Sequence, residues 1–147
     1  MKILSNKIAD FTDKEISMSG WVYSVRRSGK IGFLTFRDGF GLVQCIVAKN
    51  DVGEDKFELF KTLTQESSLT ITGKVVENER APGGFEIIVN DIELHQLSKD
   101  YPISPKEHGA DFLMSNRHLW LRSKKQHAIL KIRHQIIKSI RDYFDSN

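Results

Sequence analysis

The sequence predicts a mainly β protein: a five-stranded barrel with a helix between its third and fourth strands, followed by a hinge segment and one long C-terminal helix. Three observations support this prediction. Five segments within the first hundred residues show strand-like alternation of apolar and polar residues, whereas one segment between the third and fourth has helical spacing. Near the end of the chain, isoleucines recur at helical spacing. With 147 residues, the chain has room for one such barrel and little more.

The first three strands are expected at residues 16–27, 32–37 and 42–48. Turn-forming residues separate them, because Ser28-Gly29-Lys30 and Asp38-Gly39 are typical of hairpins. The second strand places two sets of side chains on opposite faces, so that one set fills the core and the other is free to meet a ligand. The first set is Leu34 and Phe36, and the second is Phe33, Thr35 and Arg37.

Between residues 51 and 64 the apolar spacing changes from two to three and four, which predicts a short helix. Strand chemistry returns at residues 68–77 and 85–97, with Ala81-Pro82-Gly83-Gly84 as the intervening hairpin loop. Three strands, a helix and two more strands match the order of the oligonucleotide-binding (OB) barrel. An SH3-like barrel lacks that helix, and a generic β-sandwich has more strands.

The character of the chain changes after residue 97. Residues 99–123 contain two prolines and show no sustained period, which is typical of a linker with its own local packing. Residues 124–144 are helical by periodicity, with one apolar stripe of Ile129, Ile132, Ile136, Ile137, Ile140 and Phe144. Such a stripe needs a cover, so we expect a truncated larger protein, a dimer or both.

Composition excludes several classes of function. The single cysteine, Cys45, lies in an apolar run, so there is no disulfide framework and we expect a core thiol in a reducing, cytoplasmic compartment. No signal peptide is evident, and no apolar run approaches the roughly 18 residues that a membrane span needs. The histidines lack metal-site spacing, and no glycine-rich phosphate loop or serine nucleophile motif occurs. We therefore expect no metal site, no cofactor and no catalytic residue in this chain.

Nucleic-acid binding is the leading hypothesis, and it depends on clustered charge because the net charge is only +3. Eight Lys or Arg against three acidic residues lie between residues 99 and 133. On the predicted barrel Phe33 is placed to stack on a base, and Gln44 interrupts an apolar strand where a base edge would satisfy its amide. For Phe33, packing under a loop is the open alternative. A second basic group could bind phosphates, although its arginines could simply be solvated. It comprises Arg26, Arg27, Lys30 and Arg37.

Four segments, in order, resemble the N-terminal portion of asparaginyl-tRNA synthetases, which are class II enzymes of the subgroup shared with the aspartyl and lysyl enzymes. They are GWVYSVRRSGKIGFLTFRDGFGLVQ, QESSLTITGKV, APGGFEIIVNDIEL and YPISPKEHGADFLMSNRHLWLRS. The resemblance implies an anticodon-binding barrel over residues 1–98, a hinge over 99–123, and, over 124–147, the first helix of a truncated catalytic domain at a homodimer interface. The parent enzyme would activate asparagine with ATP and Mg²⁺ and esterify it to tRNA(Asn). This piece lacks the ATP-binding motifs and should be inactive alone.

The same resemblance assigns roles to individual residues. The family's base-stacking aromatic falls on Phe33, its amide that reads the central uridine on Gln44, and its first-strand arginine on Arg26. The acid that faces the first anticodon base falls on Glu86, for which a solvated carboxylate is the open alternative. A second-strand arginine falls on Arg37, without a settled role.

Three other interpretations remain open at this point. The first is an aspartyl or non-discriminating aspartyl-tRNA synthetase fragment, which would prefer or tolerate C as the third anticodon base. The second is a stand-alone OB module that binds single-stranded nucleic acid without sequence preference. The third is a paralogue that kept the synthetase framework for another purpose.

Overall fold

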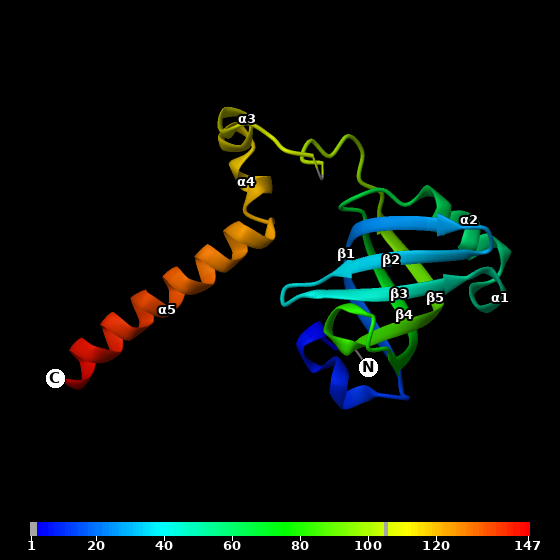
Figure 1. The fold of residues 1–147 in the computed structure, drawn as a ribbon, viewed down its shortest axis with the longest axis horizontal. Coiled ribbons are helices and arrows are strands. Elements are labelled where there is room, and N and C mark those ends of the chain that lie inside the picture. The colour runs from blue at the N-terminus through cyan, green and yellow to red at the C-terminus, as the bar shows by residue number, and fades with distance from the viewer. Residues whose placement is uncertain (1–2, 105) are drawn as a thin grey trace. The chain divides into compact units, whose positions relative to one another are not determined.

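The computed structural model describes residues 3–104 and 106–147 of the chain, which form two compact units (Figure 1). The first unit is Met1–Tyr101 and holds all the strands. The second, Pro102–Asn147, is helical.

The first unit is a closed barrel in which the strands follow the order β1-β2-β3-β5-β4. All neighbouring strands are antiparallel except β3 and β5, which pair in parallel as the barrel closes. This arrangement confirms the predicted five-stranded OB fold. The strands are β1 (Glu15–Ser28), β2 (Ile31–Arg37), β3 (Leu42–Ala48), β4 (Ser68–Glu77) and β5 (Phe85–Gln96).

Alternate residues of the strands fill the barrel interior, as the sequence pattern predicts. Leu34 and Phe36 of β2 are fully buried, whereas Phe33, Thr35 and Arg37 lie on the outer face. Cys45 is likewise fully buried, and burial together with the nearby negative charge of Glu86 raises the pKa of its thiol far above the usual range. The thiol is therefore inert and serves as a small apolar core group.

One irregularity in β1 decides which side chains face outward. The register of β1 against β2 shifts between Val22 and Ser24, which leaves Tyr23 as a bulge. Val22 points inward, and after the bulge Val25 takes the inward position that Ser24 would otherwise occupy. Arg26 therefore lies on the outer face, where it pairs with Phe33 of β2.

The connection between β3 and β4 contains two helices, α1 (Lys49–Val52) and α2 (Glu54–Thr62), instead of the single helix predicted over residues 51–64. The break occurs at Gly53, whose φ of 81° belongs to the left-handed region that favours glycine. Phe57 and Phe60 of α2 are buried. A Cβ at Gly32 would lie 2.1 Å from the Phe60 ring, so only glycine allows this end of the barrel to close over α2.

Two short 3-10 helices lie outside the sequence prediction: η1 (Ser5–Phe11) and η2 (Pro82–Gly84). Asp38, which follows β2, ties η1 to the barrel because its carboxylate accepts hydrogen bonds from the backbone N–H and the hydroxyl of Ser5, both at 2.6 Å. It also accepts from the N–H groups of Phe40 and Gly41. Burial alone would raise the pKa of Asp38, but these hydrogen bonds hold it below its usual value.

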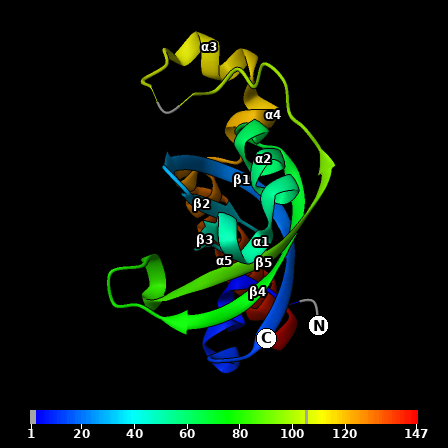
Figure 2. The same cartoon turned by 90° about the vertical axis from the view of Figure 1, so that its right-hand side faces the viewer.

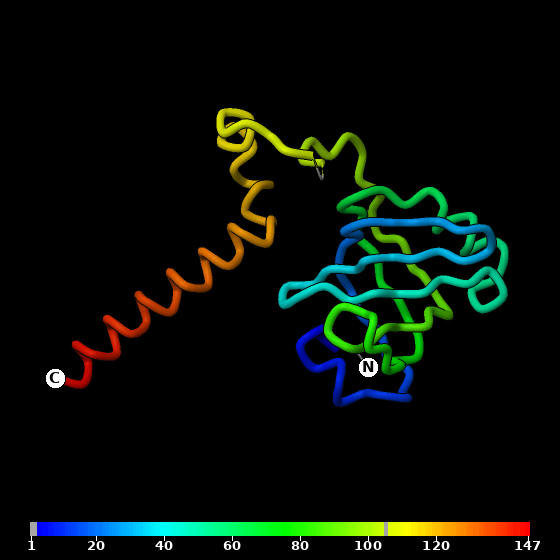
Figure 3. Tube along the Cα trace, viewed as in Figure 1, coloured from blue at the N-terminus to red at the C-terminus, as the bar shows by residue number. Residues whose placement is uncertain are grey.

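The second unit contains α3 (Ala110–Ser115), α4 (Arg117–Trp120) and α5 (Lys124–Ser146). The first two lie within residues 99–123, the segment predicted as a linker, and α5 confirms the predicted long C-terminal helix (Figure 3). Ser123 caps α5 by accepting a hydrogen bond from the N–H of Gln126. Apolar residues along α5, among them Ile132, Ile136 and Ile140, are exposed. No helix among the described residues has the length and apolar character to cross a membrane.

Candidate nucleic-acid interface

The outer face of β1, β2, β3 and β5 brings four of the predicted site residues onto one surface, which we call the reading face. Strand register defines it: Arg26 of β1 pairs with Phe33 of β2, and Thr35 of β2 pairs with Gln44 of β3. Gln44 in turn pairs with Glu86 of β5 across the parallel ladder. The reading face therefore runs across four hydrogen-bonded strands, and its residues are fixed by backbone pairing and not by loop conformation.

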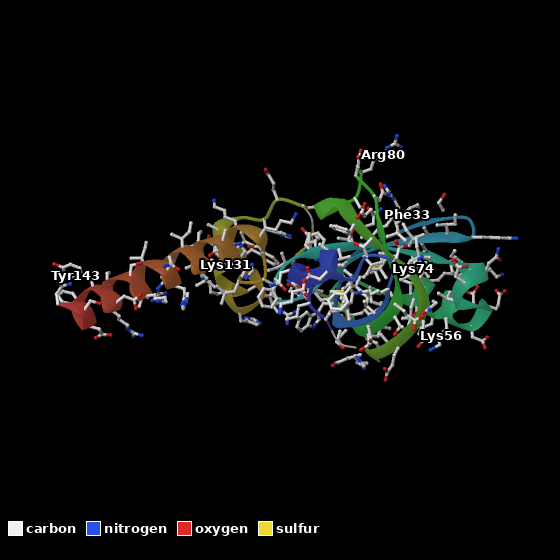
Figure 4. The ribbon with its side chains drawn as sticks, turned by 90° about the horizontal axis from the view of Figure 1, so that it is seen from below. Phe33, Lys56, Lys74, Arg80, Lys131 and Tyr143 are labelled. Carbon is white, nitrogen blue, oxygen red and sulfur yellow. The ribbon has the colours of Figure 1, made fainter. Side chains whose placement is uncertain are left out.

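Phe33 provides a flat apolar ring on the reading face. Its side chain is half-buried on the outside of the barrel, in the position labelled in Figure 4. The guanidinium of Arg26 lies over the ring, 5.0 Å from its centroid, which is a favourable cation–π arrangement. The pair combines a stacking platform for a base with a cation for the adjoining phosphate, the two elements that single-strand binding sites share.

Gln44 and Glu86 form the polar part of the reading face. The Nε2 group of Gln44 donates a hydrogen bond to Oε2 of Glu86 at 3.2 Å, and both side chains are half-buried. A carboxylate accepts hydrogen bonds only, whereas an amide both donates and accepts. The pair therefore leaves one N–H of the amide, its oxygen and several carboxylate lone pairs available to the hydrogen-bonding edge of a base.

The structure places the other three predicted residues differently. Arg27 turns its guanidinium to the end of α2, where it donates to the carbonyl oxygens of Lys61 and Leu63. Lys30 is exposed in the turn between β1 and β2. Arg37, at the far end of β2, lies on the same outer face and forms a salt bridge of 2.6 Å with Glu66.

Two residues at this surface, Ile46 and Arg80, were not predicted. Ile46 shares the outward parity of Gln44 in β3, pairs with Phe33 on one side and with Ile88 of β5 on the other, and adds apolar area beside the ring. The strand alternation that identified Phe33 could have identified Ile46 too.

Arg80 lies in the loop between β4 and β5, beside η2, which contacts β3. This loop projects from the same side of the barrel as the outer faces of β2 and β3 (Figures 1 and 2), and Figure 4 shows Arg80 and Phe33 toward the same edge. Backbone hydrogen bonds brace the loop, since the N–H of Asn78 donates to the carbonyl of Gly84 at 2.9 Å. The loop therefore holds the cation of Arg80 beside the reading face. The length of the loop did not indicate that Arg80 would lie there.

Among the described residues there is no group of three or more His, Cys, Asp or Glu side chains that could hold a metal ion. The reading face offers an aromatic ring, an amide, a carboxylate and nearby cations. These are the groups that read unstacked bases of single strands and loops.

Comparison with known proteins agrees with this class of site. Residues 16–94 match the family model described as "OB-fold nucleic acid binding domain". The chain belongs to this family of nucleic-acid-binding OB-fold domains.

More specific similarity extends over nearly the whole chain. It is 50% identical over 144 residues to an asparagine–tRNA ligase of Pelotomaculum thermopropionicum and 48% identical to one of Sorangium cellulosum, covering 98% and 97% of this chain. A crystal structure of asparaginyl-tRNA synthetase from Pyrococcus horikoshii complexed with asparaginyl-adenylate matches 97% of the chain at 38% identity, with a TM-score of 0.91. These similarities confirm the resemblance indicated by the four sequence segments. The chain spans only about a third of these proteins, namely 34%, 32% and 34% of their lengths.

Proposed function

We propose that this chain is the tRNA anticodon-binding portion of an asparagine–tRNA ligase and that the reading face binds the anticodon loop of tRNA(Asn). The observation that carries the proposal is the joining of Phe33, Gln44 and Glu86 on neighbouring strands of a chain whose relatives at about half identity are asparagine–tRNA ligases. An anticodon loop presents unstacked bases, so a curved sheet can read them without opening a helix.

Within this proposal each residue has a physical role. Phe33 stacks on the middle base, Arg26 and Lys30 contact phosphates, and Gln44 reads the edge of a uracil. Glu86 faces the first anticodon base or acts through Gln44. Arg27 and Arg37 support the face through contacts within the protein, because the end of α2 and Glu66 hold their guanidinium groups.

The role of the whole enzyme follows from the same relatives. The parent protein would activate asparagine with ATP and Mg²⁺, transfer it to tRNA(Asn) and work in the cytoplasm as a homodimer. Residues 1–98 would be the anticodon-binding domain, residues 99–123 the hinge, and residues 124–147 the start of the catalytic domain, with the exposed isoleucines of α5 at the dimer interface. We expect the 147 residues alone to form no aminoacyl-adenylate.

Titration with anticodon stem-loops tests the proposal. Fluorescence anisotropy would compare a stem-loop that carries the asparagine anticodon, one with C in place of U at the third base, and an unstructured pyrimidine strand. We expect the tightest binding to the asparagine stem-loop. Equal or tighter binding to the C variant would instead assign the chain to an aspartyl or non-discriminating enzyme. Equal binding to the pyrimidine strand would make it a sequence-tolerant single-strand binder.

A further inference from the structure

A glutamine amide by itself discriminates poorly between uracil and cytosine. Uracil presents a carbonyl acceptor beside a ring N–H donor, and cytosine presents an amino donor beside a ring nitrogen acceptor. An amide turned by 180° about its terminal bond is complementary to the second pattern as well as to the first. A freely turning Gln44 would therefore serve both bases, and selection between them requires a group that fixes its orientation.

Glu86 is placed to fix that orientation. It is the register partner of Gln44 in the parallel β3–β5 ladder, and its Oε2 accepts a hydrogen bond from Nε2 of Gln44 at 3.2 Å. If the amide turned over, its oxygen would face a carboxylate oxygen, and two acceptors would then oppose each other. Both side chains are half-buried, so solvent screens this repulsion less than at an exposed site.

The position of Glu86 is itself fixed. It is the second residue of β5, directly after the braced β4–β5 loop, and it is paired on both sides, with Gln44 of β3 and with Val76 of β4. The carboxylate is thus attached to a part of the barrel that has little freedom to move aside when RNA binds.

We propose that Glu86 is a positioning residue that locks the amide of Gln44 in one orientation and thereby gives the reading face its preference for uracil over cytosine at the middle anticodon base. The inference rests on the proposed function. It differs from direct reading of the first anticodon base by Glu86, because it assigns the effect of Glu86 to the middle base and routes it through Gln44.

The test measures the preference for U over C at the middle base in four proteins: the wild type, Glu86→Gln, Gln44→Ala and the double variant. In Glu86→Gln the new amide can offer either a donor or an acceptor to Gln44, so both orientations become available. We expect the U-over-C ratio of affinities to fall by about fivefold or more, the scale of one bidentate base contact. In the Gln44→Ala background the same change at position 86 should leave the ratio as it is.

A matched control removes the same charge elsewhere on β5. Glu93 is exposed on that strand, and Glu93→Gln should leave the middle-base ratio at its wild-type value. Circular dichroism melts of each variant would establish that the barrel is folded, and affinities would be measured on folded protein.

Two outcomes would overturn the inference. One is an unchanged middle-base ratio in Glu86→Gln, including the case in which only the preference at the first anticodon base changes. The other is a fall in the ratio that persists when Gln44 is already alanine. Failure of the proposed function is a different result, since the wild type itself would then bind the asparagine stem-loop no better than a pyrimidine strand.

Discussion

Two arginines at opposite ends of the β1–β2 ladder occupy similar local settings. Arg26 lies over Phe33 at 5.0 Å, and Arg37 lies over Trp21 at 5.6 Å, in both cases across a pair of register neighbours. Arg37 also forms a salt bridge with Glu66, in which the two side chains are only 14% and 5% exposed. Arg26 is exposed, and among the described residues no carboxylate pairs with it.

One pair of strands thus serves two purposes. At the Arg37 end, charge is neutralised inside the protein and the arginine belongs to the fold. At the Arg26 end, the positive charge and the aromatic ring remain available to an anionic ligand. In this barrel, the arginine–aromatic pair without an acidic partner among the described residues is the one that we propose as part of the binding site.

The largest effect should come from Arg37→Ala. Removing one partner of a buried ion pair leaves the other charge uncompensated, so we expect a loss of about 3 to 5 kcal/mol in the free energy of unfolding. Urea denaturation measures it, and Arg26→Ala is the matched control, expected to change stability by less than about 0.5 kcal/mol. Equal losses in the two variants would remove the distinction between the two ends.

Phe33→Ala should produce the opposite pattern. We expect binding of the asparagine stem-loop to weaken by about 1 to 3 kcal/mol, the usual scale for one base–aromatic stack. Unfolding should stay cooperative, because the ring lies outside the barrel core. Anisotropy titration measures the affinity, and Trp21→Ala, at the other end of the ladder, serves as the control for loss of a surface ring. Unchanged affinity in Phe33→Ala would take the ring out of the binding site.

Much of the fold and part of the reading face could be predicted from local sequence patterns. Alternation in residues 32–37 placed Phe33 and Leu34 on opposite faces of the strand, since side chains of a strand alternate between faces whatever the partner strand is. The bulge at Tyr23 could in principle have been predicted, because Val22 and Val25 are three positions apart, a spacing that breaks the period of two. The break between α1 and α2 could have been predicted from Gly53, because glycine favours the left-handed backbone found there, with φ 81°.

Pairings between distant segments could not be predicted from the residues. The Gln44–Glu86 contact joins residues 42 apart, and it exists because β3 and β5 meet in parallel where the barrel closes. The Arg37–Glu66 pair spans 29 residues. Alternation fixes which face a side chain occupies, but the register between such distant strands depends on the bulges and loops between them. The family resemblance named Gln44 and Glu86 separately, and only the structure joined them.

The Arg37 end also carries a pH dependence, through Asp38. The hydrogen bonds to Asp38 hold its pKa below the usual value. The ionised carboxylate therefore stabilises the folded state at pH values above the pKa of an ordinary aspartate. This contribution is lost as the pH falls through the pKa of the folded state. Asp38→Asn should cost about 1.5 kcal/mol near neutral pH, the scale of a hydrogen bond to a charged group.

Urea unfolding of the wild type and Asp38→Asn at a series of acidic pH values measures this contribution. The difference between the two proteins should shrink as the pH falls. Asp10→Asn, at an exposed position of η1, is the control and should show only a small difference at every pH. A difference for Asp38→Asn that stays constant into strong acid would contradict ionic anchoring of η1.

The smallest effect is expected at Lys30, in the turn beside the Arg26 end. Its exposed side chain suits a phosphate, which carries no base information, so Lys30→Ala should weaken all stem-loops alike. The slope of log affinity against log salt should become shallower by roughly 0.7, the value for one single-strand phosphate contact. Lys56 pairs with Asp91 and lies toward the opposite edge of the barrel from Phe33 in Figure 4. The control variant Lys56→Ala should therefore leave the slope unchanged. A loss confined to one anticodon would mean that Lys30 contacts a base, and the uncompensated charge at this end would then contribute to specificity as well as to affinity.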